Sequence, residues 1–167
     1  MINAAGSGLG KIDTGSAEIL SSVGWLPDNQ TIVYGVLGGS GFTFTTYNLH
    51  NGERNELFSF QNKAGYGAIS ADGQWIVFDD KVFGEDNWGI YIARLDGSQR
   101  RLVASWDVPT AFTSIWVSGK EGESNELWLI LNTKNAEGIE IPVLINPFTC
   151  QAVRLQRVNG IVEGWNP

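Results

Sequence analysis

The sequence contains one cysteine, Cys150, one histidine, His50, and one methionine. A lone cysteine excludes a disulfide within the chain and any metal site built from several cysteines, and it leaves the redox compartment undetermined. A catalytic triad would have to be built around His50, which lies beside Asn51 and Gly52 in an expected hairpin turn. Nothing near His50 supplies the carboxylate and nucleophile that a triad needs. We therefore expect an exposed turn residue there, and no enzyme activity within this chain.

Long apolar runs and basic residues are also scarce. The densest apolar run, LWLIL at residues 127–131, is far shorter than the roughly 18 residues that a membrane helix needs. The opening stretch, MINAAGSGLGKIDTG, has neither the basic start nor the apolar run of a signal peptide. Eleven Lys and Arg residues against 18 Asp and Glu residues give a net charge of −7. This balance predicts a soluble chain without nucleic-acid binding or membrane insertion.

Glycine and aromatic residues are abundant. The chain has 21 Gly, 7 Trp, 4 Tyr and 8 Phe residues, a composition that favours strands and tight turns over helices. Apolar spacing fits a helix only around residues 16–22, and Gly15 and Gly24 confine that stretch. The sequence therefore predicts an all-β fold.

The chain also repeats itself. WLPDNQTIVY at residues 25–34 aligns with ISADGQWIVF at 69–78, and YNLHNGERNEL at 47–57 aligns with YIARLDGSQRRL at 91–102. A looser third copy runs through SIWVSGKEGESNELWLIL at 114–131 and PVLINPFTCQAVRL at 142–155. The final EGWNP, at 163–167, resembles VGWLP at 23–27. Self-similarity of this period, about 40 to 45 residues, is typical of β-propeller blades.

Each repeat unit predicts one blade of four antiparallel strands. In the clearest copy the strands are expected near residues 67–70, 74–78, 89–93 and 99–103. The second strand is apolar at consecutive positions, which indicates a sheet covered on both faces. Asp72-Gly73 and Asp96-Gly97 suit the tight turns of hairpins. Trp25, Trp75 and Trp128 are expected to fill the space between blade faces.

Together these units make up a single propeller segment. We expect the end of a blade at residues 1–22, then blades at 23–60, 65–105 and 112–158, and the first strand of a further blade at 161–167. Three blades with partial neighbours are too few for a ring of six or seven. The sequence therefore predicts a piece of a longer propeller, or a ring completed by self-association or by pairing with further blades.

The second unit, SADGQWIVFDD…WGIYIARLDGSQRRLV, resembles the repeat of TolB-like β-propellers, a WD-repeat-like architecture. Ala71 departs from the family pattern at a proline, which Pro27 keeps in the preceding copy. The positions that match are Ser70, Asp72, Gly73, Ile90, Tyr91, Asp96, Gly97 and Leu102. The resemblance covers residues 23–105 closely and 112–167 loosely. It implies a propeller in a periplasmic or extracellular setting, and it is specific for architecture more than for function.

An acidic stretch follows the second strand of the clearest copy. FDDKVFGEDNWG at residues 78–89 contains Asp79, Asp80, Glu85 and Asp86, which could supply oxygen ligands to Ca²⁺. The spacing is not that of an EF-hand loop, and a charge run is also typical of a solvated surface loop. Calcium is the one cofactor for which this sequence offers candidate ligands.

The link after the second unit, VASWDVPTAF at residues 103–112, places Trp106 and Asp107 just before Pro109. Such links line one end of a propeller, where partners dock. An exposed Trp beside an acid could anchor a peptide or sugar, or the ring could instead plug the junction between blades. Trp88, Trp106 and Asp107 are the candidate binding residues.

Three functions fit these features. The first is a non-enzymatic propeller module that presents loops for protein, peptide or ligand binding. The alternative is the accessory propeller of a prolyl-oligopeptidase-like serine peptidase, whose catalytic domain would lie outside this segment. A Gly-x-Ser-x-Gly element downstream in the parent reading frame would favour this alternative. The third is a structural segment whose main property is self-association.

Overall fold

The computed structural model describes residues 18–38, 41–60, 67–82, 87–106, 114–118, 127–134 and 140–154. Within these ranges the chain is built from strands, and they include no helix that could cross a membrane. The strands of the first sheet are β1 (Glu18–Trp25), β2 (Thr31–Gly38), β3 (Gly41–Asn48) and β4 (Arg54–Phe60). Those of the second are β5 (Gly67–Ile69), β6 (Trp75–Lys81), β7 (Trp88–Arg94) and β8 (Arg101–Trp106). Those of the third are β9 (Ser114–Ser118), β10 (Leu127–Lys134), β11 (Glu140–Ile145) and β12 (Ala152–Arg154).

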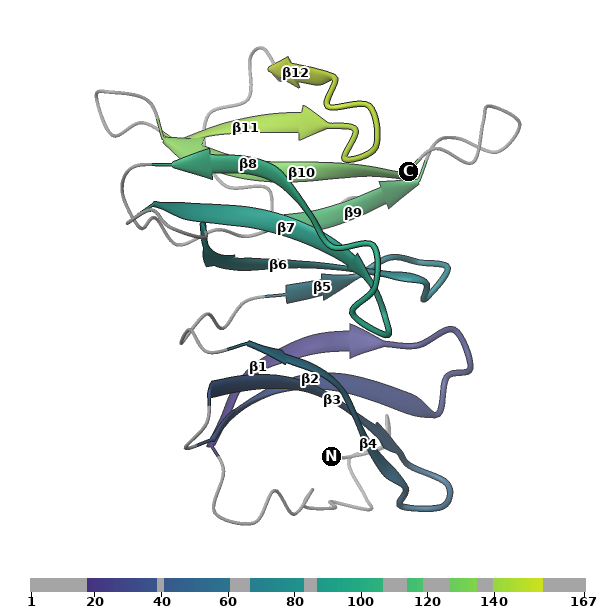
Figure 1. Ribbon diagram of the computed structural model, residues 1–167. Helices are drawn as coiled ribbons and strands as arrows, with labels where there is room; N and C mark the ends of the chain where they lie inside the picture. Colours follow the sequence, from purple (N-terminus) through teal and green to yellow (C-terminus); the bar gives the residue numbers. More distant parts are fainter. Residues whose placement is uncertain are drawn as a thin grey trace.

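Each sheet consists of four consecutive antiparallel strands, and the three sheets stack face to face (Figure 1). The first strands share one edge of the stack, since β1 contacts β5 and β5 contacts β9. This is the arrangement of propeller blades, whose first strands lie innermost. The predicted all-β fold of four-stranded antiparallel blades is therefore confirmed.

One predicted blade boundary was wrong. The first sheet begins at Glu18 and not at residue 23, because Glu18 pairs with Leu37 and Ile19 with Val36 across β1 and β2. Residues 18–22 thus belong to the first sheet and not to the end of a preceding blade. Residues 1–17 and 161–167, where parts of further blades are predicted, lie outside the described residues.

The consecutive apolar residues of β6 serve two cores. Side chains alternate along a strand, so Ile76 and Phe78 face the first sheet while Trp75 and Val77 face the third. Both cores are buried, and the middle sheet therefore has no wet face. This explains why the sequence of β6 does not alternate between apolar and polar residues.

The core between the first and second sheets is mainly aromatic. Phe44 of the first sheet and Phe78 of the second meet edge to face, with ring centroids 5.7 Å apart, and Phe60 stacks on Phe78 at 5.4 Å. Such ring pairs stabilise by about 0.5–1.5 kcal/mol beyond the burial of their area. The other members of this core are Val23, Val33, Phe42, Ile76, Tyr91 and Ala93.

The core between the second and third sheets is mainly aliphatic. Leu129 and Leu131 of β10 pack against the middle sheet, and Trp75 meets Phe148 edge to face at 4.9 Å. Trp75 thus fills the space between blades as predicted. Trp25 does not, because it lies at the end of β1 opposite Ile32 and is exposed.

Two Asp-Gly turns of the second sheet press against the first. Gly73 and Gly97 have φ angles of 69° and 80°, as hairpin turns of this kind require. A Cβ on Gly73 would lie 2.5 Å from Cδ of Pro27, and one on Gly97 would lie 2.7 Å from Cβ of Phe58. Glycine therefore serves both the turn and the close approach of the neighbouring blade.

Replacing Gly97 with alanine is expected to lower the free energy of unfolding by about 3 kcal/mol. About 1 kcal/mol reflects the left-handed backbone, and the rest reflects the clash with Phe58. Gly52 is the matched control, because its φ is 73° and a Cβ there would meet only the Tyr47 hydroxyl, at 3.8 Å. Gly52→Ala should cost about 1 kcal/mol. Urea unfolding followed by tryptophan fluorescence measures both, and equal losses would contradict the proposed contact.

Candidate functional site

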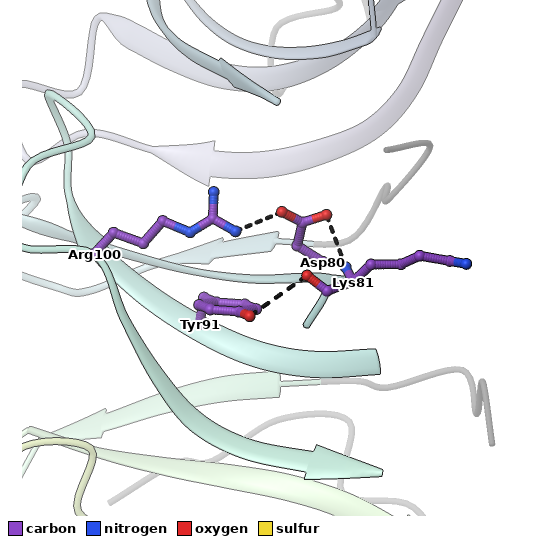
Figure 2. A network of polar contacts seen from close by, with 4 residues as sticks. All are labelled: Asp80, Lys81, Tyr91 and Arg100. Atoms are coloured by element: carbon purple, nitrogen blue, oxygen red, sulfur yellow. Dashed lines mark hydrogen bonds and ion pairs between the residues drawn. The ribbon is translucent and has the colours of Figure 1, made fainter. Parts of the chain in front are cut away.

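Polar residues enter the aromatic core at one place between the first and second sheets. Asp80 lies two residues after Phe78 on β6 and so shares its face, and Tyr91 of β7 lies opposite Phe78. Arg100 precedes β8 and extends along this face toward Asp80 (Figure 2). The strand register therefore gathers an acid, a phenol and a guanidinium beside the Phe rings.

The Asp80 carboxylate is buried and forms an ion pair with Arg100, with 2.5 Å between Oδ2 and a guanidinium nitrogen. Its other oxygen accepts the backbone N–H of Lys81 at 2.8 Å. The Tyr91 hydroxyl lies 3.5 Å from the Lys81 carbonyl oxygen. Figure 2 shows these contacts in sequence, from Arg100 to Asp80, from Asp80 to the backbone of Lys81, and from Lys81 to Tyr91.

The Arg100 guanidinium also lies over aromatic rings of both sheets. Its Cζ is 4.4 Å from the centroid of Tyr91, 5.2 Å from that of Phe78 and 5.9 Å from that of Phe60. A cation over ring faces is attracted by their quadrupoles, and pairing with Asp80 offsets its desolvation. Since Phe60 belongs to β4, Arg100 joins the second sheet to the first. The cluster is suited to holding blades together.

Two residues of the predicted calcium site are placed by the structure. Asp79 and Asp80 are consecutive on β6, so their side chains point to opposite faces of the sheet. Asp80 is paired with Arg100, which occupies an oxygen that calcium would need. Glu85 and Asp86 lie outside the described residues, and within those residues no three His, Cys, Asp or Glu side chains gather. The calcium site stays a prediction.

Two of the candidate binding residues meet at one end of the second sheet. Trp88 begins β7 and Trp106 ends β8, and their Cα atoms are direct partners in the antiparallel register. The Trp88 ring is half-buried and packs against the core between the first two sheets. Asp107 lies outside the described residues.

The opposite end of the sheets carries tight turns fixed by side-chain caps. The β1–β2 turn is held by Asp28, which accepts the Thr31 hydroxyl at 2.6 Å and the amides of Gln30 and Thr31 at 2.9 and 2.8 Å. Asn48 caps the β3–β4 turn by accepting the amides of His50 and Asn51. His50 is exposed there, where the sequence predicted an exposed turn residue.

Hydrogen bonds within two of the turns lower the carboxyl pKa values of Asp28, in the β1–β2 turn, and Asp96, in the β7–β8 turn. The Thr31 hydroxyl, followed by the amides of Gln30 and Thr31, holds the pKa of Asp28 below its ordinary value. Ser98, through its hydroxyl and its amide, does the same for the pKa of Asp96. A pKa lowered in the folded state contributes stability above the unfolded value, and this contribution is lost as pH falls through the folded pKa.

Arg100 is the member of the polar cluster that sequence reasoning missed. In the sequence it is only the first of two adjacent arginines, Arg100 and Arg101, and its partners Asp80 and Phe60 are distant along the chain. The one available signal was an acid at a core-facing position of β6, because a buried carboxylate needs a partner.

Comparison with known proteins finds similarity at the level of structure. Neither a protein-family model nor a curated protein sequence matches the chain. TolB from Acinetobacter baumannii superposes with a TM-score of 0.58 at 16% identity, over 92% of this chain and 47% of that one. The chain has the fold of TolB-like β-propellers.

Two further structures agree with this TolB-like fold. A putative TolB from Agrobacterium tumefaciens gives a TM-score of 0.56 at 17% identity, over 80% of this chain and 47% of its own. An uncharacterised protein from Listeria monocytogenes EGD-e gives 0.62 at 18% identity, over 87% of this chain and 41% of its own. The chain therefore spans less than half the length of each of these three structures. Identities this low establish the fold alone.

Replacing Arg100 with methionine is expected to lower the free energy of unfolding by about 2 kcal/mol, because the buried Asp80 carboxylate loses its cation. Arg100→Lys should recover only part of this loss, since an ammonium lacks the planar fork that stacks on rings. The double variant Asp80→Asn, Arg100→Met should be more stable than Arg100→Met alone. Denaturant unfolding of the wild type, Asp80→Asn, Arg100→Met and the double variant measures the coupling, and additive losses would contradict the pairing.

Acid sensitivity should follow the Asp28 cap. As pH falls below about 4, the folded wild type loses the stability that the lowered pKa of Asp28 supplied. Asp28→Asn should therefore show a shallower decline of its urea midpoint between pH 5 and pH 2 than the wild type. Glu56→Gln, an exposed change on β4, serves as the charge control. Parallel declines for wild type and Asp28→Asn would refute the assignment.

Proposed function

We propose that this chain is a non-enzymatic β-propeller module that binds a protein or peptide partner through the end of its second blade. The observation that supports this most is the pairing of Trp88 with Trp106 across β7 and β8. Asp107 follows directly in the sequence. Tryptophan is enriched among the residues that contribute most of the binding energy at protein interfaces.

The scaffold suits this role because the binding residues come from a rigid element. Trp88 is packed on the aromatic core, so β7 and β8 present that end of the sheet in a fixed orientation. The only histidine lies in a capped turn at the opposite end, with its amide bound to Asn48. The peptidase alternative depends on a catalytic domain outside this segment, and a Gly-x-Ser-x-Gly element downstream in the parent reading frame would favour it.

Peptide selection on the immobilised chain tests the proposal. Phage-displayed peptides should be enriched, and synthetic copies of them should lose at least tenfold in affinity to Trp106→Ala and Asp107→Ala. His50→Ala, at the opposite end, is the matched control and should bind like the wild type. Trp88 is left unchanged, because its ring supports the core. No enrichment, or equal affinity for all variants, would overturn the proposal.

A further inference from the structure

The middle sheet has one face toward the first sheet and one toward the third, and the other two sheets have corresponding faces. We call these the backward face and the forward face. In the second sheet, Ile69, Ile76 and Leu95 belong to the backward face and pack on the first sheet. Val77 and Ile92 belong to the forward face and pack on the third sheet. The middle sheet therefore shows what a backward face and a forward face contact when a sheet lies on each side.

The first sheet repeats the backward face without a described sheet behind it. Trp25 pairs with Ile32 as Ile69 pairs with Ile76. Leu49 occupies the place of Leu95, since its amide bonds the Gln30 carbonyl at 2.8 Å as the Leu95 amide bonds that of Gln74 at 3.1 Å. Ile69 and Leu95 are packed, whereas Trp25 is 53% exposed and Leu49 is 36% exposed.

The exposed part of this backward face lies at its turn end. Farther along the sheet, Tyr34 and Val36 are buried. At the turn end Ile32 and Tyr47 are half-buried beside Trp25. Two turn glycines at the same end differ in the same way: a Cβ on Gly97 would meet Phe58 of the preceding sheet, whereas among the described residues a Cβ on Gly52 would meet Tyr47 of its own sheet.

The third sheet presents the complementary forward face. Leu129 and Leu131 point to the second sheet, so Ile130 points away from it. Ile130 pairs with Leu144, and Leu144 with Val153, which places these three side chains in one row across the forward face. Ile130 is buried, Leu144 is half-buried and Val153 is 52% exposed.

We propose that a second copy of this chain packs the forward face of its third sheet, through Leu144 and Val153, against Trp25 and Leu49 of the first. The contact repeats, at the turn end of the sheets, the meeting of a forward face with a backward face that occurs twice within the chain. Two such contacts related by a twofold axis would cover the exposed Trp25, Leu49 and Val153 side chains of both copies. This inference is independent of the proposed peptide-binding role.

Light scattering on a size-exclusion column tests the contact. The wild type should be a dimer at low micromolar concentration. Trp25→Glu and Val153→Lys should each raise the dissociation constant at least tenfold, because each places a charge in both contacts of the dimer. Mixing the two variants should restore a dimer, since the mixed pair has one wild-type contact and one contact that joins Glu to Lys.

Leu102→Gln is the control, because Leu102 is an exposed apolar residue of the middle sheet and lies on neither end face. It should leave the dimer intact, and circular dichroism with thermal melting should show every variant folded. A wild type that stays monomeric at high micromolar concentration would overturn the proposal. So would a dimer indifferent to Trp25→Glu and Val153→Lys, or monomeric variants that do not associate when mixed.

Discussion

The structure depends on apolar contact between the faces of neighbouring sheets. The middle sheet is buried on both sides, by the Phe cluster on one and by Leu129, Leu131 and Ile145 on the other. Burial of a large apolar side chain contributes about 1.5–3 kcal/mol, so several such residues per face outweigh what any single turn or ion pair contributes. Each blade is therefore stable chiefly through its neighbours, as in other repeat architectures.

Contact between sheet faces also restricts which residue types are tolerated in the turns and at buried polar positions. Glycine is needed at residues 73 and 97 because the preceding sheet lies within 3 Å of where a Cβ would stand. A carboxylate is tolerated at Asp80 because Arg100 reaches it along the same face. Backbone conformation alone would have allowed asparagine or aspartate at the turn positions. The adjacent blade is what removes that freedom.

The sequence predicted the blades well because their signals are local. Tight Asp-Gly turns and the apolar run of residues 75–78 located the strands of the second sheet to within a few residues. The start of β1 was misplaced, since residues 18–22 were assigned to the end of a preceding blade, whereas they pair with β2. The Arg100 cluster was out of reach, because it joins β4, β6 and β7 through contacts that no local pattern encodes.

Positions where one sheet departs from the repeat can give that sheet a property that its neighbour lacks. Tyr34 and Thr45 stand opposite each other, as Phe78 and Tyr91 do in the next sheet. Their hydroxyls are buried and have no hydrogen-bond partner within the described part of the chain. Burial raises the pKa of Tyr34, while the charge of Arg54 opposes that rise. An unpaired buried hydroxyl costs about 1–3 kcal/mol, a cost that blade packing alone does not explain. Stability would favour phenylalanine and valine there, so these two polar side chains distinguish the first sheet from the second.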